Sequence, residues 1–407
     1  MHRFDERRRQ LLRAGTALGL GAATGMGVLR HAVAASTAPR TLIAIHLAGG
    51  NDSLNTVIPY ATPAYARIRG TLAIPADSVL KLDGRTGLNP ALKGLKALWD
   101  RKRVAVVHGV GYPDFDYSHF QAMEIFWTAD PARSTVTGWL GRAIDTATVG
   151  ATRPDPLTGM AIGSGMQPSL IAQRFTAPQL PADPAGFWLP SVNSRHNAAL
   201  EQVLQQPAAG INYLYDGFLR SAQSALGAYD QVLEAKALTP GATYPDTTFA
   251  KSLRFATQLM RSDEDVRVVT LSQGAYDTHE NQLPTHARLL GELDAGLSAF
   301  FADLDRNGLA NRVLVLLWSE FSRRVLPNAN AGTDHGAAQA MVLIGPGVRP
   351  TIFGTAPTLA DDELVEGGNL PMQFDFRRIY AETLGGWLGI DPRPVLGASY
   401  PALDVLL

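Results

Sequence analysis

The chain has 407 residues, of which 46% are hydrophobic, and a formal net charge of −1. This composition provides enough apolar residues for a large core. It contains no cysteine, which excludes disulfide bonds and thiol chemistry. The near-neutral charge predicts neither a basic face for nucleic acid nor a polybasic membrane anchor.

The first 35 residues have the pattern of an export signal. Arg7, Arg8 and Arg9 precede a 16-residue apolar run, 14–29, that contains five glycines, and 32–35 reads Ala-Val-Ala-Ala. A charged region, an apolar region and an Ala-x-Ala site in this order are typical of secretory signals. Arg8-Arg9-x-Leu-Leu-Arg resembles a twin-arginine signal, and the run is too short and glycine-rich to span a membrane. We therefore expect a signal peptide at 1–35, recognition by the twin-arginine export machinery, and a periplasmic or secreted product.

The mature chain predicts one α/β domain. Residues 1–34 carry six arginines and two acids, so the remainder has 30 basic and 35 acidic residues, a net charge of −5. Short apolar runs rich in branched residues predict strands at 41–47, 103–108, 265–271, 312–318 and 340–344. Helical spacing predicts helices at 90–101, 285–307 and 379–388. Such alternation favours a mostly parallel sheet with helices on both faces, a three-layer αβα sandwich.

One region departs from this alternation. Residues 198–261 look largely helical, with a break at Thr239-Pro240-Gly241. We interpret them as a helical insertion into a single domain that spans 36–407. The length of the mature chain also permits two domains.

Polar clusters follow the predicted strands. Asn51 and Asp52 come after the first strand, Ser118 and His119 after the second, Asp277 and His279 after the third, and Glu320 ends the fourth. Ligands of open α/β sheets bind outside the carboxyl ends of the strands, so these side chains are expected at one edge. The sequence therefore predicts a polar site assembled from several loops.

Asp334 and His335 complete this set. They lie between Gly332 and Gly336, on the loop before the last strand. A carboxylate beside an imidazole can supply oxygen and nitrogen ligands to one divalent cation. Glycines on either side let the backbone and a substrate approach closely. Mixed Asp and His ligands suit Zn²⁺ or Mn²⁺ better than Ca²⁺.

Several motifs resemble a known group of proteins. Asp52 after strand one, a serine opening a helix, a mid-chain Asp/His group and a later Asp-His-Gly occur in the order of the alkaline phosphatase-like superfamily. More closely, four spaced motifs resemble a bacterial twin-arginine-exported family of unknown function within that superfamily; they are Leu-Ala-Gly-Gly-Asn-Asp at 47–52, Ser-His-Phe at 118–120, Ser-Glu-Phe at 319–321 and Asp-Phe-Arg at 375–377.

The resemblance implies a function and roles. The protein would be an exported metal-dependent hydrolase of phosphate or related esters, acting on a small anionic substrate. Asp52, Asp334 and His335 would hold one metal ion, and Asp277 and His279 would contribute to a second. The catalytic set implied by the resemblance is a Ser118 nucleophile, an Asn51 hydrogen bond to a substrate oxygen and an Arg323 pairing with the anion.

The chain also departs from the superfamily pattern. One residue, not three, separates Asp277 from His279, and no histidine follows His335. Glu320, His119 or His286 are candidates for the missing ligand, and we include Glu320 in the predicted metal set. The chain lacks a Ser-x-Pro-x-Arg motif as well as cysteine, which argues against a conventional sulfatase.

Two other functions remain open at this point. A non-catalytic exported binding protein on a phosphatase-like scaffold would explain an incomplete metal set, because a fold does not determine a function. A metal-free serine esterase of the Gly-Asp-Ser-Leu type would use Ser53, although Asn51 interrupts that motif. Metal content separates the esterase from the others, and turnover separates an enzyme from a binding protein.

Overall fold

A computed structural model describes residues 39–151, 154–163, 167–184, 202, 219–220, 223–224 and 226–407. The predicted signal peptide at 1–35 and the first half of the predicted helical insertion lie outside these residues, apart from a few isolated positions. The chain divides after Thr37, and the unit Ala38–Leu407 carries everything that follows. No helix in the described ranges has both the length and the apolar character needed to cross a membrane.

The described residues form a nine-stranded sheet in the order β11-β5-β10-β9-β1-β8-β6-β7, with β12 paired to β5. In this order the strands are β11 (Ile352–Phe353), β5 (Val104–Gly111), β10 (Gln339–Ile344), β9 (Val313–Trp318), β1 (Thr41–Leu47), β8 (Val268–Gln273), β6 (Gly159–Ile162) and β7 (Gln179–Leu180), with β12 at Phe374–Asp375. β10 is antiparallel to β5 and β9, whereas the other pairings within this sheet are parallel. The mostly parallel α/β sheet predicted from the sequence is therefore confirmed.

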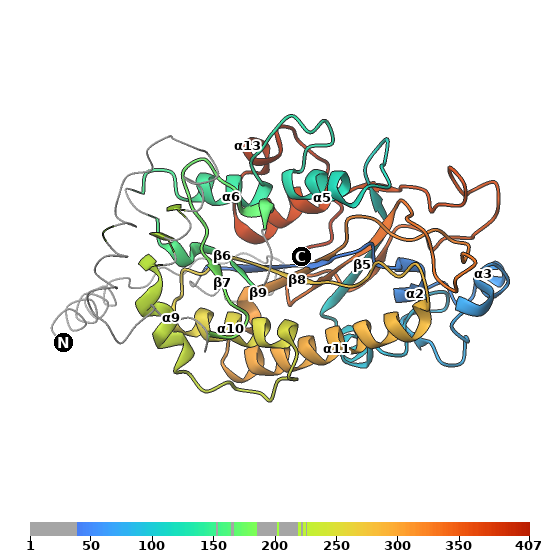
Figure 1. Cartoon of the computed structure of the whole chain (residues 1–407), viewed down its shortest axis with the longest axis horizontal. Helices are drawn as coiled ribbons and strands as arrows, with labels where there is room; N and C mark the ends of the chain where they lie inside the picture. The colour runs from blue at the N-terminus through green and yellow to red at the C-terminus, as the bar shows by residue number, and fades with distance from the viewer. Residues whose placement is uncertain are drawn as a thin grey trace, which may run out of the picture. The chain divides into compact units, whose positions relative to one another are not determined.

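Each central strand buries both of its faces. β1 is buried at all seven positions. Ile43 and Ile45 join one apolar cluster, and Leu42 and Ala44 join another on the opposite face. Because successive side chains of a strand point to opposite faces, a continuous apolar run fits a sheet that is covered on both sides. In Figure 1, α10 and α11 lie along one side of the sheet, and α5, α6 and α13 lie on the other.

The helices agree with the sequence patterns in position and differ at their ends. The α-helices are α2 (Ser53–Thr56), α3 (Pro63–Arg69), α4 (Lys93–Asp100), α5 (His119–Thr128), α6 (Trp139–Ala147), α9 (Tyr229–Lys236), α10 (Thr248–Ser262), α11 (Gln282–Arg306), α12 (Phe376–Glu382) and α13 (Pro392–Leu396). Short 3-10 turns occur at Gly70–Leu72, Pro156–Thr158, Pro168–Leu170 and Ala310–Arg312, and a π-helical segment at Thr383–Leu388 follows α12. A second, small sheet has the order β2-β4-β3, with strands Val57–Ile58, Gly87–Leu88 and Leu80–Lys81.

The strand register brings the polar loops to one edge of the sheet. In the parallel pairings, Leu47 lies opposite Gln273, and His46 lies opposite Trp318. β1, β8 and β9 therefore end at the same level. The loops that follow these strands carry Asp52, Asp277 and Glu320.

Candidate metal centre

Three imidazoles surround one carboxylate oxygen at this edge. The Oδ1 atom of Asp277 lies 3.0 Å from Nε2 of His279, 3.3 Å from Nε2 of His335 and 3.5 Å from Nε2 of His119. The ligand atoms of His119, Asp277 and His335 all lie within 4.8 Å of one another, and this is the one group of such residues in the described ranges with metal-ligand geometry. Nε2 of His279 adjoins it, 2.9 Å from Nε2 of His335.

Each imidazole turns its other nitrogen toward an oxygen that can only accept a hydrogen bond. Nδ1 of His119 lies 2.7 Å from Oε1 of Glu320, and Nδ1 of His335 lies 2.6 Å from the carbonyl oxygen of Tyr117. Nδ1 of His279 lies 3.3 Å from Oδ1 of Asp334. With the proton on Nδ1, the lone pair of each Nε2 is available to a cation bound at the group. Metal-binding histidines have this arrangement.

The Nε2 atom of His119 has no hydrogen-bond partner in the described residues, although it is buried. A buried polar atom without a partner is costly and needs an explanation. Its lone pair faces Asp277 and His335, the other members of the group. A divalent cation bound between these three side chains would satisfy all of them, so the donor set fits a metal ion.

Glu320 is the buried support of His119. Its side chain is 1% exposed and also accepts hydrogen bonds from His46 and the main-chain N–H of Gly49. Burial acts to raise the pKa of Glu320, but the hydrogen bonds from His119 and His46 outweigh it and hold the pKa far below its usual range. The hydrogen bond to the charged Glu320 raises the pKa of His119, which makes its free nitrogen a stronger base.

The environments of Asp277 and His335 favour the forms that bind metal. Burial acts to raise the pKa of Asp277, but the hydrogen bond and the charge of Arg323 lower it overall, so the side chain is a carboxylate. Burial lowers the pKa of His335, and the positive charge of Arg323 lowers it further, so the neutral imidazole is favoured. The side chains of Asp277 and His279 are 46% and 43% exposed, which leaves the group open to solvent.

Arg323 ties the loops of this edge together. Its guanidinium is fully buried and donates to the main-chain carbonyls of Gly49, Gly50 and Thr333 as well as to Asp277. The sequence resemblance assigned Arg323 to the substrate anion. Its N–H groups instead face protein oxygens, and it fixes the position of Asp277.

Glycines permit the close approach of these loops. A Cβ atom at Gly332 would lie 2.2 Å from the carbonyl carbon and oxygen of His279. At Gly336 it would lie 2.5 Å from the carbonyl carbon of Arg323, and at Gly49 it would lie 2.5 Å from the main-chain nitrogen of Asp277. This agrees with the role that the sequence predicted for the glycines around Asp334 and His335.

Two residues of the predicted site make their contacts elsewhere. The carboxylate of Asp52 is fully buried, pairs with Arg69, accepts from Gln282, and caps α2 through the N–H groups of Leu54 and Asn55. The side chain of Asn51 bonds to Thr56 and His286. Both residues follow β1 as expected, but their polar atoms are occupied by protein partners and do not join the group around Asp277.

Ser118 occupies the N-cap of α5, directly before His119. Its hydroxyl accepts a 3.5 Å hydrogen bond from the N–H of Gln121, and its side chain is half-buried. The sequence left a nucleophile and a helix cap as alternatives for this residue. The cap is present, and Ser118 directly precedes His119 in the chain.

His119 is the member of the group that the sequence did not place in the predicted metal set. It appeared there only as a candidate for a missing ligand. The usable signal was its position on the loop after β5, where it begins α5 next to Ser118. Glu320 and Asp334, which were in that set, lie behind His119 and His279 as hydrogen-bond acceptors.

A comparison with curated proteins finds no match. Among solved structures, the chain is similar to the lipoteichoic acid synthase LtaP from Listeria monocytogenes, with 8% identity over 86% of this chain and 72% of the other, at a TM-score of 0.38. It is also similar to a protein in the alkaline phosphatase superfamily from Vibrio parahaemolyticus, with 10% identity over 90% and 72% of the two chains, at a TM-score of 0.39. A third structure, the PsFucS1 sulfatase from Pseudoalteromonas sp., has 11% identity over 86% and 68%, at a TM-score of 0.36. These values are too low to assign an activity.

A family model described as "Protein of unknown function (DUF1501)" matches residues 106–398. The matched region runs from β5 to α13 and contains His119, Asp277, His279 and His335. Because the match covers well over half of the chain, the chain belongs to this family of proteins of unknown function.

Proposed function

We propose that the protein is a metal-dependent hydrolase of phosphate or related anionic esters. His119, Asp277 and His335 would hold one divalent cation, with His279 beside them. The observation that carries this proposal is the convergence of three imidazole Nε2 atoms on one oxygen of Asp277. The proposal places this centre at the carboxyl edge of an alkaline phosphatase-like αβα sandwich.

The donor set favours Zn²⁺ or Mn²⁺. Imidazole nitrogens outnumber carboxylate oxygens in the group, which suits these ions better than Ca²⁺ or Mg²⁺. When bound, such an ion would stabilise negative charge on an ester oxygen and lower the pKa of an attacking hydroxyl. A site with several protein ligands and an open side is the arrangement expected of a catalytic rather than a structural metal.

Ser118 is the proposed nucleophile. Its Oγ would lose its proton and form a bond to the phosphorus atom while the bond from phosphorus to the leaving alcohol oxygen breaks, and the leaving alcohol would take up that proton. Attack of water would then release phosphate and restore the hydroxyl. The main-chain N–H groups at the start of α5 favour an anion at this position.

Arg324, rather than its neighbour, is proposed to attract the substrate anion. Its guanidinium carbon lies 5.3 Å from the centre of the Tyr117 ring, and the carbonyl of Tyr117 holds His335. The terminal N–H groups of a guanidinium can pair with two oxygens of a phosphate group.

Hydrolysis by the purified mature protein tests this function. Phosphomonoesters, phosphodiesters and sulfate esters are assayed with added Zn²⁺ or Mn²⁺. We expect turnover of at least one anionic ester, its loss in His119→Ala and Ser118→Ala, and its retention in Ser134→Ala, a serine of an exposed loop. If Ser118→Ala keeps full activity, the nucleophile is wrong. Stoichiometric metal without turnover of any ester would favour the alternative of a non-catalytic binding protein.

We also propose that residues 1–35 are a twin-arginine signal and that the mature domain begins at residue 36. The consecutive arginines and the glycine-rich apolar run support this. Replacing Arg8 and Arg9 by lysine should leave the precursor in the cytoplasm. Normal export of that variant, detected by fractionation, would contradict the proposal.

The serine esterase alternative has less support. The hydroxyl of Ser53 is buried and accepts a hydrogen bond from the main-chain N–H of Ala340. Activation of a serine requires a base bonded to its hydroxyl, and among the described residues no hydrogen bond joins Ser53 Oγ to an imidazole or a carboxylate. Ser53 takes part instead in the wall of a separate cavity.

A further inference from the structure

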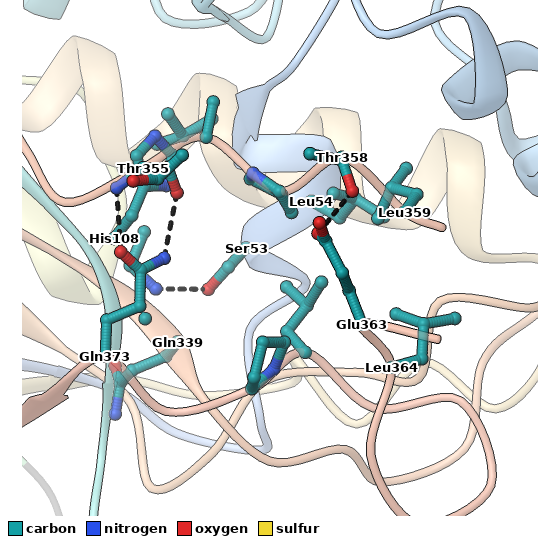
Figure 2. Close-up of a pocket in the computed structure, with 17 residues that line it drawn as sticks. Ser53, Leu54, His108, Gln339, Thr355, Thr358, Leu359, Glu363, Leu364 and Gln373 are labelled. Atoms are coloured by element: carbon teal, nitrogen blue, oxygen red, sulfur yellow. Dashed lines mark hydrogen bonds between the residues drawn. The ribbon is translucent and has the colours of Figure 1, made fainter. Parts of the chain in front are cut away.

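A cavity of about 410 Å³ lies under the long loop between β11 and β12. Its floor is formed by Ser53, His108 and Gln339, and the loop 355–373 supplies its cover. Figure 2 shows His108, Thr355 and Gln373 on one side of this cavity and Thr358 and Glu363 on the other. A cavity of this volume is in the range of small-molecule sites.

Hydrogen bonds join the two ends of the covering loop. Between β11 and β12 the structure assigns no helix or strand over residues 354–373. The side-chain amide of Gln373 donates to the carbonyl of Thr355 and accepts from its N–H, at 2.8 and 2.7 Å, and the N–H of Gln373 donates to Gly109. Loops of this length inside compact domains usually serve binding or function.

The charge of the cavity walls favours a different class of ligand from the anionic esters proposed for the metal centre. Among the described residues that line it there is no lysine or arginine, and Glu363 supplies a negative charge. Most of the wall area comes from apolar side chains, which include Leu54, Val57, Leu359 and Leu364. An anionic molecule would meet no compensating cation there, whereas an uncharged apolar body would be well accommodated.

His108 supplies an unsatisfied polar group. It lies in β5 and is only 5% exposed, and its Nε2 atom has no hydrogen-bond partner in the described part of the chain. Burial lowers the pKa of His108 to about 4, so the imidazole is neutral at neutral pH. A neutral imidazole has one donor and one acceptor nitrogen. A ligand hydroxyl, which can both donate and accept, would satisfy Nε2 in either tautomer.

From these observations we infer that the cavity binds a small uncharged molecule with an apolar body and a hydroxyl group, the hydroxyl bonded to Nε2 of His108. The apolar side chains would hold the body, and the loop 355–373 would cover it. This site is separate from the metal centre, and its occupation does not depend on hydrolysis.

The test uses the uncharged fluorophore N-phenyl-1-naphthylamine and the full mature protein. Saturable binding of the fluorophore is measured first. Three competitors of similar size then displace it: 2-naphthylmethanol, 2-methylnaphthalene and 2-naphthoate. We expect the alcohol to bind about fivefold more tightly than the hydrocarbon, as one additional hydrogen bond allows, and the carboxylate to be the weakest.

Four variants locate the binding. Ala356→Trp fills the cavity and should abolish fluorophore binding, whereas Ala132→Trp on an exposed loop should not change it. His108→Leu should keep fluorophore binding and remove the preference for the alcohol over the hydrocarbon. His335→Ala, in the metal centre, should leave all of these affinities unchanged. Absence of saturable binding, unchanged binding in Ala356→Trp, or tighter binding of the carboxylate than of the alcohol would overturn the inference.

Discussion

The carboxylates at the strand ends divide into a proposed ligand and two supports. Asp277 points an oxygen at three imidazole nitrogens, whereas Glu320 and Asp334 face the opposite nitrogens of His119 and His279. All three are carboxylates on loops at the same edge of the sheet. They differ in which nitrogen of an imidazole they contact. Substitution of Asp277 would therefore remove a proposed ligand, whereas substitution of Glu320 or Asp334 would remove a hydrogen-bond partner of a ligand.

Glu320→Gln tests the support of His119. The amide removes the charge that raises the pKa of His119 and holds its ring. Because partners of this kind tune metal affinity by about 10- to 100-fold, we expect the metal affinity to fall by that factor. Metal titration of the variant is compared with Glu124→Gln, a change on the exposed face of α5 whose carboxylate pairs with Arg133. Equal affinity in the two variants would show that Glu320 does not support the centre.

Asp52→Asn distinguishes a structural carboxylate from a ligand. The change leaves the buried charge of Arg69 without its counter-ion, and such losses cost about 3–5 kcal/mol. We expect the free energy of unfolding, measured by chemical denaturation, to fall by this amount while the metal content stays unchanged. Asp100→Asn breaks an exposed pair with Lys96 and should cost about 1 kcal/mol or less. Loss of metal with native stability would restore Asp52 to the metal site, as the sequence resemblance implied.

At the scale of elements, the loops after β8 and β9 are held in contact by glycine. Gly332→Ala would force its Cβ against the main chain of His279, at 2.2 Å in the present positions. We expect the loops to separate and the metal affinity to fall at least tenfold, because ligands of a metal site must keep their geometry. Gly274→Ala is the matched control, since a Cβ there meets no atom within 4 Å. Similar metal affinity in both variants would contradict this role.

The packing of α11 on the loop after β1 makes stability depend on pH. Burial lowers the pKa of His286 in α11 to about 4, and this side chain bonds to Asn51. In the unfolded chain the pKa is about 6.5, so between pH 4 and 6.5 the unfolded state binds the additional proton. The contribution of this residue to stability is therefore complete above pH 6.5 and is lost as the pH falls toward 4.

The variant His286→Gln isolates this effect because glutamine does not titrate. The free energy of unfolding is measured with urea at pH 7.5 and at pH 5.0. Its decrease between these two pH values should be about 2 kcal/mol larger for the native protein than for the variant. His108, which is shifted in the same direction, is present in both proteins and cancels in the comparison. The same pH dependence in both proteins would show that His286 is not buried in its neutral form.

For the molecule as a whole, the sequence predicts the scaffold better than the site. Strands such as 41–47 and 312–318 were found because a sheet covered on both faces requires continuous apolar runs. The gathering of their loops follows from parallel strands that end together. The sequence contained no spacing signal for the pairing of Asp52 with Arg69, which comes from α3 and is formed only by the fold.

The directions of the loop side chains likewise could not be predicted from the sequence. Ala275 and Asn281, on the loop after β8, have positive φ values of 75° and 45°. Residues other than glycine adopt this backbone region rarely, so a sequence pattern does not predict it. These turns help to set where Asp277 and His279 point. Asp277 and His279 were predicted as ligands from the family resemblance, but their placement beside His119 could not be predicted.

Metal content of the purified mature protein tests the central claim most directly. Protein exchanged into metal-free buffer and then loaded with Zn²⁺ or Mn²⁺ is compared with the variant His119→Ala/His335→Ala and with His286→Gln as a control outside the centre. We expect one ion per chain in the native protein and in His286→Gln, and none in the double variant. Absence of bound metal in the loaded native protein, or full metal content in the double variant, would contradict the account.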